Sequence, residues 1–150
     1  MNRDFRDLLA EFNGQGVDFI IVGAYALAAH GHVRATQDLD VWVCPEAENA
    51  KRVYRALQKF GAPLQDLTEA DLATAGIIFQ IGVDPIRIDI ITAIDGVEFT
   101  DAWANRMSTK FDDQPASVLS KEDLIRNKRA AGRTQDLADL ERLEARGKKS

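Results

Sequence analysis

Two aspartates, Asp38 and Asp40, stand at the start of an apolar segment in RATQDLDVWVCP (residues 34–45). Successive side chains of a β-strand point to opposite faces, so the two carboxylates share one face while Leu39 and Val41 point to the other. Neighbouring like charges disfavour each other's ionised form unless a cation compensates them. The spacing therefore indicates either a pair of metal ligands or two strand-end aspartates that cap or pair locally.

A third carboxylate, Asp89, lies in the middle of a second apolar segment, IRIDII (86–91). Isoleucines occupy alternate positions there, so Arg87 and Asp89 point to the opposite face. If the two segments are neighbouring strands, Asp89 converges on Asp38 and Asp40, and three carboxylates together need cations between them. No His/Cys cluster competes, and oxygen ligands suit magnesium or manganese rather than zinc. The sequence therefore predicts a divalent-metal site.

A buried strand passes directly into a helix at Gly23, in IIVGAYALAAHG (20–31). Unpaired backbone N–H groups at a helix start, together with the positive end of its dipole, suit a phosphate. Gly23 would allow close approach of the backbone, and Arg34 in the following loop could supply positive charge. One glycine between a strand and a helix, however, usually only makes the turn.

Alternating helices and strands must position these residues, and the chain has no repeats or obvious linker. The pattern predicts a helix before NGQG (13–16), a strand at VDFIIV (17–22), a short helix at AYALAAHG (24–31), and a helix from Pro45 to Gly61. Beyond these, GIIFQIGVDPIRIDIIT (76–92) predicts a β-hairpin, and the tail predicts a helix capped by Ser120 and separated by Gly132 from a last helix.

Size and composition indicate one globular domain, residues 1–150, because 45% of the residues are hydrophobic and 29% are charged. The net charge of -5 argues against a protein that coats DNA through a broad basic surface. The sequence has no signal-peptide core and no apolar run long enough to span a bilayer. Its one cysteine, Cys44, cannot form an internal disulfide, so we expect a cytoplasmic protein with no membrane partner.

The chain resembles the nucleotidyltransferase superfamily, whose fold is shared with DNA polymerase beta, in three successive motifs: Val22-Gly23-Ala24, Asp38-Leu39-Asp40-Val41 and Ile88-Asp89-Ile90. The stretch RATQDLD (34–40) and the tail LSKEDLIRNKRAAGRTQDLADLERL (119–143) resemble more closely the small bacterial branch that includes the AbiEii-type toxins of toxin–antitoxin systems. This resemblance covers about residues 17–143, and the ordered set of motifs is more specific than any one of them.

The resemblance implies an α+β fold in which helices flank a mixed β-sheet, with a helical C-terminal tail. The implied catalytic core spans about residues 17–92, and the tail spans about residues 120–146. One residue departs from the family pattern, because Ala24 stands where relatives carry Gly or Ser. A hydroxyl contact to phosphate is therefore missing, although the backbone N–H is retained.

The implied activity is transfer of a nucleoside monophosphate (NMP) from a nucleoside triphosphate (NTP) to an acceptor hydroxyl. Asp38 and Asp40 would hold two Mg²⁺ or Mn²⁺ ions on the triphosphate, and Asp89 would complete the site near the attacking hydroxyl. The rival hypothesis is a non-catalytic nucleotide-binding or antitoxin-like module with the same fold. The presence of all three acids counts against that rival, and Ala24 counts slightly for it.

Nucleotide contacts are implied for Gly23, Ala24, Arg34 and Lys128. Lys128 is the candidate for a triphosphate contact, and as an exposed lysine it would contribute little to stability. Arg34 and Lys128 fit equally well as solvated surface residues or as ion-pair partners of the acids.

Five further residues carry a structural and a functional interpretation. Arg133 and Asp136 match charged positions of the family tail, or brace a helix start. His30 and His32 flank a glycine and fit turn chemistry better than metal ligation. Trp42 shares the face of the aspartates and could stack on a base, but a packed aromatic is the better interpretation.

The acceptor is left open by the sequence. Residues 121–150 hold nine Lys/Arg and six Asp/Glu, whereas residues 1–120 hold ten and eighteen. A basic tail on an acidic body could guide a tRNA end or dock an acidic partner protein whose hydroxyl is modified. A small antibiotic is a third acceptor, but such enzymes usually carry an added helical domain that this chain is too short to contain.

Overall fold

The computed structural model describes residues 1–33, 38–83 and 86–148. The seven helices in these residues are α1 (Arg3–Gly14), α2 (Gly23–Ala29), α3 (Ala47–Phe60), α4 (Glu69–Leu72), α5 (Phe99–Asn105), α6 (Lys121–Ala131) and α7 (Thr134–Lys148). The six strands are β1 (Phe19–Val22), β2 (Leu39–Val43), β3 (Ile78–Val83), β4 (Ile86–Ile91), β5 (Met107–Phe111) and β6 (Gln114–Val118).

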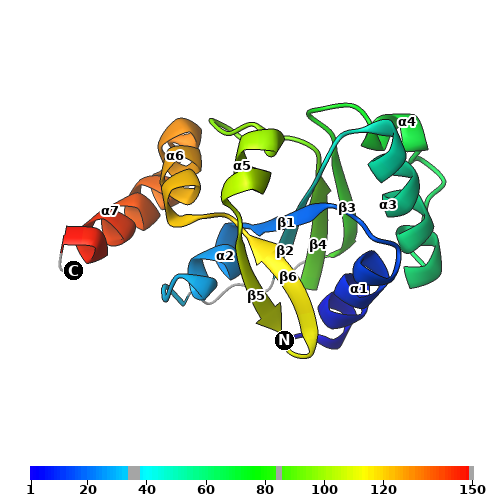
Figure 1. Ribbon diagram of the computed structural model, residues 1–150, viewed down its shortest axis with the longest axis horizontal. Helices are drawn as coiled ribbons and strands as arrows, with labels where there is room; N and C mark the ends of the chain where they lie inside the picture. Colours follow the sequence, from blue (N-terminus) through cyan, green and yellow to red (C-terminus); the bar gives the residue numbers. More distant parts are fainter. Residues whose placement is uncertain (34–37, 84–85, 149–150) are drawn as a thin grey trace.

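All six strands form one mixed sheet in the order β3-β4-β2-β1-β6-β5. The pairs β2–β4 and β1–β6 are parallel, and the other three pairs are antiparallel. Helices flank the sheet, and the chain ends in the helix pair α6–α7 (Figure 1). The predicted α+β class, with a mixed sheet and a helical C-terminal tail, is confirmed.

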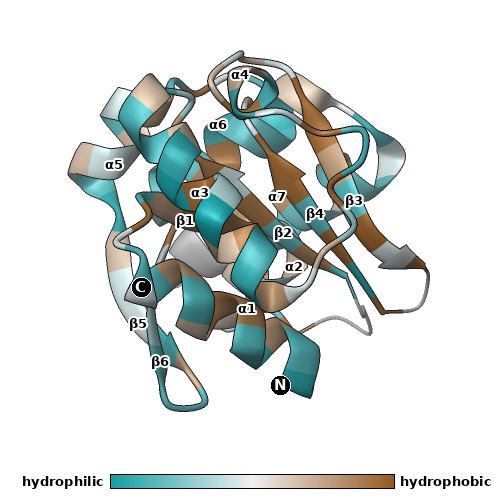
Figure 2. Cartoon of the chain, turned by 90° about the vertical axis from the view of Figure 1, so that its right-hand side faces the viewer, coloured by the Kyte–Doolittle hydropathy of each residue, from teal (hydrophilic) through white to brown (hydrophobic). Residues whose placement is uncertain are grey.

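Helices cover both faces of the central strands. Figure 1 shows α1, α3 and α4 on one side of the sheet, and α2, α5, α6 and α7 on the other. All four residues of β1 are buried, and β2 is buried except at Asp40. Figure 2 shows mainly hydrophobic residues along β2, β3 and β4, and a mixture of hydrophilic and hydrophobic residues along the helices. A partly exposed acid in an otherwise buried central strand therefore marks an opening in this covering layer.

Most predicted elements are present. The turn at Gly23 joins β1 to α2, α3 ends at Gly61 in a left-handed conformation (φ +94°), and β3 and β4 form the predicted hairpin. In the tail, the Asp123 backbone N–H donates to Ser120 Oγ (3.1 Å), and Gly132 ends α6 at φ +65°. The helix predicted to begin at Pro45 begins instead at Ala47.

The hairpin β5–β6 was not predicted, although β6 pairs with β1 near the centre of the sheet. Its strands, MSTKF and QPASV, contain few large apolar residues, and β5 lies at the sheet edge. The sheet therefore continues to Val118, beyond the range of 17–92 expected for the core. No helix in the described part of the chain is long and apolar enough to cross a membrane.

Candidate active site

The parallel register of β2 and β4 brings the predicted acids together. Asp40 is the direct neighbour of Asp89, and Leu39 is the neighbour of Ile88. The preceding residues, Asp38 and Arg87, are in contact, with Arg87 Nη2 3.2 Å from Asp38 Oδ2. Four side chains thus occupy one face as a square of three carboxylates and one guanidinium. We call Asp38, Asp40, Arg87 and Asp89 the charged quartet.

Arg87 binds two of the three carboxylates of the quartet. Its Nε lies 2.9 Å from Asp89 Oδ1 and its Nη2 lies 3.2 Å from Asp89 Oδ2, in addition to the contact with Asp38. The sequence placed Arg87 on the acid face but assigned it no role. Within the residues described, no group of three or more His, Cys, Asp or Glu side chains is placed to hold a metal ion. The acids therefore converge, but they are arranged around an arginine.

The pKa of Asp40 is raised by its surroundings. Burial, reinforced by the carboxylates of Asp89 and Asp38, raises the pKa of Asp40 to about 6, and the positive charge of Arg87 only partly opposes this. A raised pKa means that the ionised form is poorly compensated at neutral pH. The Asp40 carboxylate therefore lacks sufficient compensating positive charge, which is typical of metal-binding acids.

Gly23 packs against Asp40 at the start of α2. Its φ is +68°, a conformation that L side chains rarely adopt, and a β-carbon at this position would overlap Oδ2 of Asp40 and lie 3.2 Å from its Cγ. Phosphate approach was the predicted reason for this glycine. The structure provides a second reason, because only a residue without a side chain leaves room for the Asp40 carboxylate.

We expect Gly23→Ala to lower the free energy of unfolding by about 2–4 kcal/mol, of which left-handed strain supplies about 1–2 and overlap with Asp40 the rest. Urea unfolding measures the loss. The matched control is Gly16→Ala, because Gly16 has φ +69° and no atom lies within 4 Å of the position that its β-carbon would take. Equal losses in the two variants would show that overlap with Asp40 contributes nothing. Adding Asp40→Ala should reduce the cost at Gly23 to that at Gly16.

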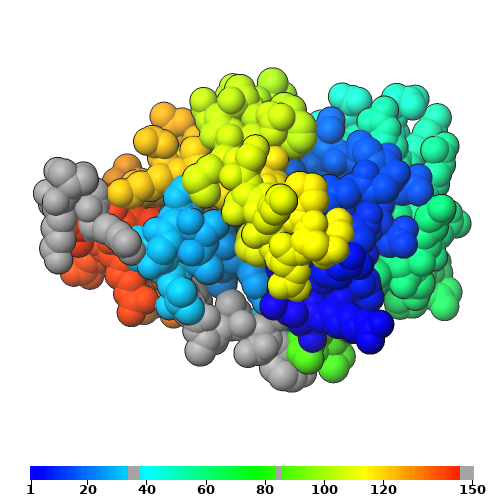
Figure 3. Space-filling view, turned by 60° about the horizontal axis from the view of Figure 1, so that its bottom comes forward, coloured from blue at the N-terminus to red at the C-terminus, as the bar shows by residue number. Residues whose placement is uncertain are grey.

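A cavity of about 550 Å³ connects the quartet with both the β1–α2 turn and the tail helices. Val22, Gly23 and Ala24 line it on one side, and residues of α6 and α7 line it on another. Figure 3 shows the surface of α2 between that of β6 and that of the tail helices. The cavity thus gathers the predicted residues Gly23, Ala24, Asp38, Asp40, Asp89 and Lys128.

Lys128 lines this cavity, but the prediction that it is exposed was wrong. Only 5% of the residue is accessible, and its Nζ lies 3.2 Å from Asp136 Oδ1 and 3.2 Å from Asp139 Oδ2. Both aspartates are also buried, and Gln135 Nε2 donates to Asp139 Oδ1 (3.1 Å). Its ion pairs are made with these two tail aspartates, whereas the alternative considered from the sequence was an ion pair with the strand acids. Lys128 therefore ties α6 to the first turns of α7.

Arg133 is the exposed cation of the same group. Its side chain is 79% accessible, its Nε donates to Asp136 Oδ2 (2.6 Å), and its backbone N–H reaches the same oxygen (3.3 Å). The proposed bracing of a helix start by Arg133 and Asp136 is confirmed. Because Arg133 also lines the cavity, it can present a guanidinium N–H to a bound anion.

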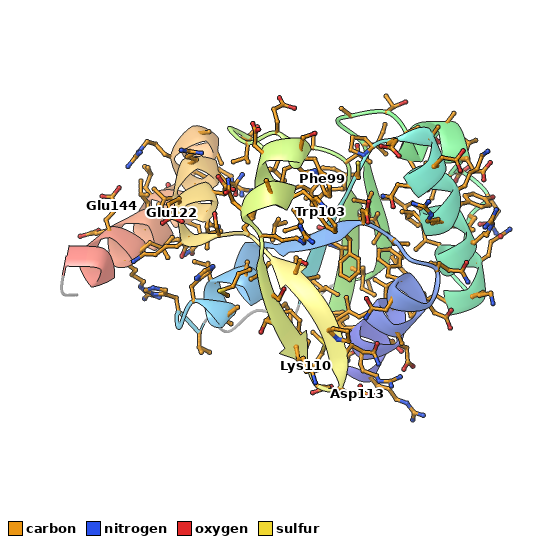
Figure 4. The ribbon with its side chains drawn as sticks, viewed as in Figure 1. Phe99, Trp103, Lys110, Asp113, Glu122 and Glu144 are labelled. Carbon is orange, nitrogen blue, oxygen red and sulfur yellow. The ribbon has the colours of Figure 1, made fainter. Side chains whose placement is uncertain are left out.

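The remaining predicted residues lie apart from the chemistry or outside the described structure. Arg34 lies outside the described residues. His30 Nε2 is 2.7 Å from the carbonyl oxygen of Leu119, so it joins α2 to the chain after β6, in keeping with turn chemistry. Trp42 is 1% accessible and packs edge-on against Phe99 at 5.0 Å, beside Trp103 on α5 (Figure 4). The packed interpretation of Trp42 is confirmed.

The donor set of the quartet fits a hard divalent cation. Its acids offer carboxylate oxygens and no sulfur or imidazole nitrogen, which is the ligand chemistry of Mg²⁺ and Mn²⁺. The uncompensated charge of Asp40 adds a favourable field for such an ion. Asp38, Asp40 and Asp89 are the residues that would hold it.

The fold places the chain in the nucleotidyltransferase class of structures. It is similar over 99% of its length to the structure of TM1012 from Thermotoga maritima, described as a "putative nucleotidyltransferase", of which it covers 92%, with a TM-score of 0.61 and 14% sequence identity. At this identity the similarity concerns the fold. A search among curated proteins finds no match.

The chain belongs to the family described as nucleotidyltransferase of unknown function (DUF6036), which it matches over residues 4–147. Membership confirms the predicted superfamily. The finer resemblance to AbiEii-type toxins stays a prediction.

Proposed function

We propose that this protein is a metal-dependent nucleotidyltransferase that moves an NMP from an NTP to an acceptor hydroxyl. The observation that carries the proposal is the pairing of Asp40 with Asp89 across β2 and β4, beside Asp38, in the wall of a cavity of about 550 Å³. Such a cavity has the volume expected for a small-molecule site. Family membership supports the same reaction class.

Asp38, Asp40 and Asp89 would hold two Mg²⁺ or Mn²⁺ ions. When bound, such ions neutralise the triphosphate, polarise the reacting phosphorus and lower the pKa of a bound hydroxyl. The quartet lies at the end of a buried central strand, so its carboxylates are held in place by packing on the opposite face.

The nucleotide would lie between the quartet and the tail. Gly23 and Ala24 line the cavity that Arg133 also lines, and their backbone N–H groups and its guanidinium can contact phosphate oxygens. Lys128 lies in the same wall, and its two aspartates hold its ammonium group in one place. Arg34, which lies outside the described residues, remains a proposed contact.

The acceptor is proposed from the charge of the tail and the finer resemblance. A tRNA end or a partner protein in a toxin–antitoxin system remains the proposed acceptor. Among the described residues of the tail, burial removes one cation, Lys128, and three acids, Asp123, Asp136 and Asp139, so the tail surface is no less basic than its composition indicates.

We expect the purified protein to bind an NTP only with magnesium or manganese present, because a triphosphate and three carboxylates repel each other without a bridging cation. Titration calorimetry with each NTP, in Mg²⁺ and in EDTA, measures this dependence. Equal binding in EDTA would contradict the metal-dependent site.

The transfer itself can be tested in cell lysate with each α-labelled NTP, followed by separation of RNA from protein. Label in the RNA fraction identifies a nucleic-acid acceptor, and label in the protein fraction identifies a partner protein. Metal-dependent NTP binding without label in either fraction, or in added small acceptors, would favour the non-catalytic module.

A further inference from the structure

Arg87 contacts two of the three acids of the quartet. It reaches both oxygens of Asp89, at 2.9 and 3.2 Å, and Oδ2 of Asp38, at 3.2 Å. These contacts place one guanidinium across two neighbouring strands, at the fourth corner of the square. The arginine therefore supplies positive charge within a group of three acids.

The guanidinium uses the atoms that a metal ion needs. Both oxygens of Asp89 accept hydrogen bonds from Arg87, and Oδ2 of Asp38 forms an ion pair with it. A divalent ion coordinated by the same oxygens at about 2.1 Å would lie close to the guanidinium, and the two positive charges would repel each other. Arg87 and a divalent cation therefore compete for these acids.

The strand register leaves space for Arg87 to move. On the side of β4 that faces away from β2, Arg87 pairs with Gly82 of β3, which has no side chain. Strand β3 is an edge strand of the sheet. The Arg87 side chain is 26% accessible and lines the cavity. Rotation of the side chain into the cavity thus requires no change in the sheet.

We propose that Arg87 is a resident counter-cation of Asp38 and Asp89, which a divalent metal ion must displace in order to bind. The inference rests on the function proposed above. It makes Arg87 a positioning residue, because it keeps the acids together while the metal is absent and weakens metal binding by competing for their oxygens.

The test is titration of Mn²⁺ by calorimetry, without nucleotide, into the parent and into Arg87→Gln. We expect the Gln variant to bind Mn²⁺ at least about tenfold more tightly, because the competing charge is gone. Its melting temperature should fall below that of the parent in EDTA, and the gap should close in saturating Mn²⁺. A purely structural arginine would lower both melting temperatures equally and leave the Mn²⁺ affinity unchanged.

Two further variants serve as controls for this measurement. Arg87→Lys keeps the charge but loses the fork, so its Mn²⁺ affinity should lie between those of the parent and Arg87→Gln; it also serves if the Gln variant does not fold. Arg6→Gln is the matched control, because Arg6 makes a similar fork to Asp113 (2.9 and 2.7 Å) outside the cavity. Its Mn²⁺ affinity should equal that of the parent.

The outcomes separate this inference from the proposed function. If the parent transfers NMP but neither Arg87 variant binds Mn²⁺ more tightly, the counter-cation role is wrong and the function stands. If no variant binds Mn²⁺ and the parent transfers nothing, both are wrong. Tighter binding in Arg6→Gln as well as in Arg87→Gln would also overturn the inference, because the effect would then follow from net charge alone.

Discussion

Asp40→Asn should abolish NMP transfer while leaving the metal-free protein at least as stable as the parent. Burial and the neighbouring acids raise the pKa of Asp40 to about 6, so ionising it at neutral pH opposes folding by up to about 3 kcal/mol. Asparagine keeps the shape and removes the charge. The same substitution removes a proposed metal ligand, and most of the stabilisation by magnesium should be lost with it.

Thermal melts of parent and Asp40→Asn, each in EDTA and in Mg²⁺, supply the four temperatures needed. The mutant should melt at or above the parent in EDTA and respond little to Mg²⁺. A mutant that melts well below its parent in EDTA, with an unchanged response to Mg²⁺, would mean that Asp40 has a structural role.

The pH dependence of stability in EDTA provides a control with a defined sign. Because the pKa of Asp40 is higher in the folded protein than in the unfolded chain, its contribution is most favourable below about pH 4 and is lost as the pH rises through about 6. The difference in unfolding free energy between parent and mutant should therefore change by up to about 3 kcal/mol over this interval. A difference that does not vary with pH would contradict the assignment.

Lys128→Met should lower the free energy of unfolding by about 3–5 kcal/mol, because it leaves Asp136 and Asp139 buried without their shared cation. Urea unfolding measures the loss. The matched control is Lys51→Met, because Lys51 is half exposed and makes only a 3.7 Å contact with Glu48. The control should change stability by less than about 0.5 kcal/mol.

A rescue variant separates the buried pair from a general loss of packing. Adding Asp139→Asn to Lys128→Met removes one of the stranded charges, and it should recover part of the lost stability. Arg133 remains to pair with Asp136. If the added substitution lowers the free energy of unfolding further, Asp139 stabilises the protein through contacts other than its ion pair with Lys128.

The convergence of the three acids could be predicted because it depends on a short-range property. Alternation along a strand determines which face Asp38, Asp40 and Asp89 occupy, and two such strands side by side bring the faces together. The same alternation placed Arg87 with them. Its contact with two carboxylates could not be predicted, because it depends on the register of β2 against β4 and on the reach of one long side chain.

The burial of Lys128 was missed for a different reason. The charges spaced along KRAAGRTQDLAD indicate surface pairs on helices, and only the packing of α7 against α6 encloses them. The only sequence signal was the spacing of Lys128 from two aspartates across Gly132.

The strand pair β5–β6 was missed because neither segment is strongly apolar. Its place in the sheet is set by pairing with β1, which lies far away in the chain.

The parallel pairing of β1 with β6 has a consequence for the folding of the chain during its synthesis on the ribosome. The strands that carry the three acids leave the ribosome well before Val118, which pairs with Ile21 and completes the sheet beside β1. Until then the apolar edge of β1 stays open, and α6 and α7 are absent from the cavity. A prematurely terminated chain therefore carries the acids without a substrate cavity, and its open edge directs it to aggregation or proteolysis. The proposed nucleotide transfer would thus begin only after α6 and α7 have been synthesised.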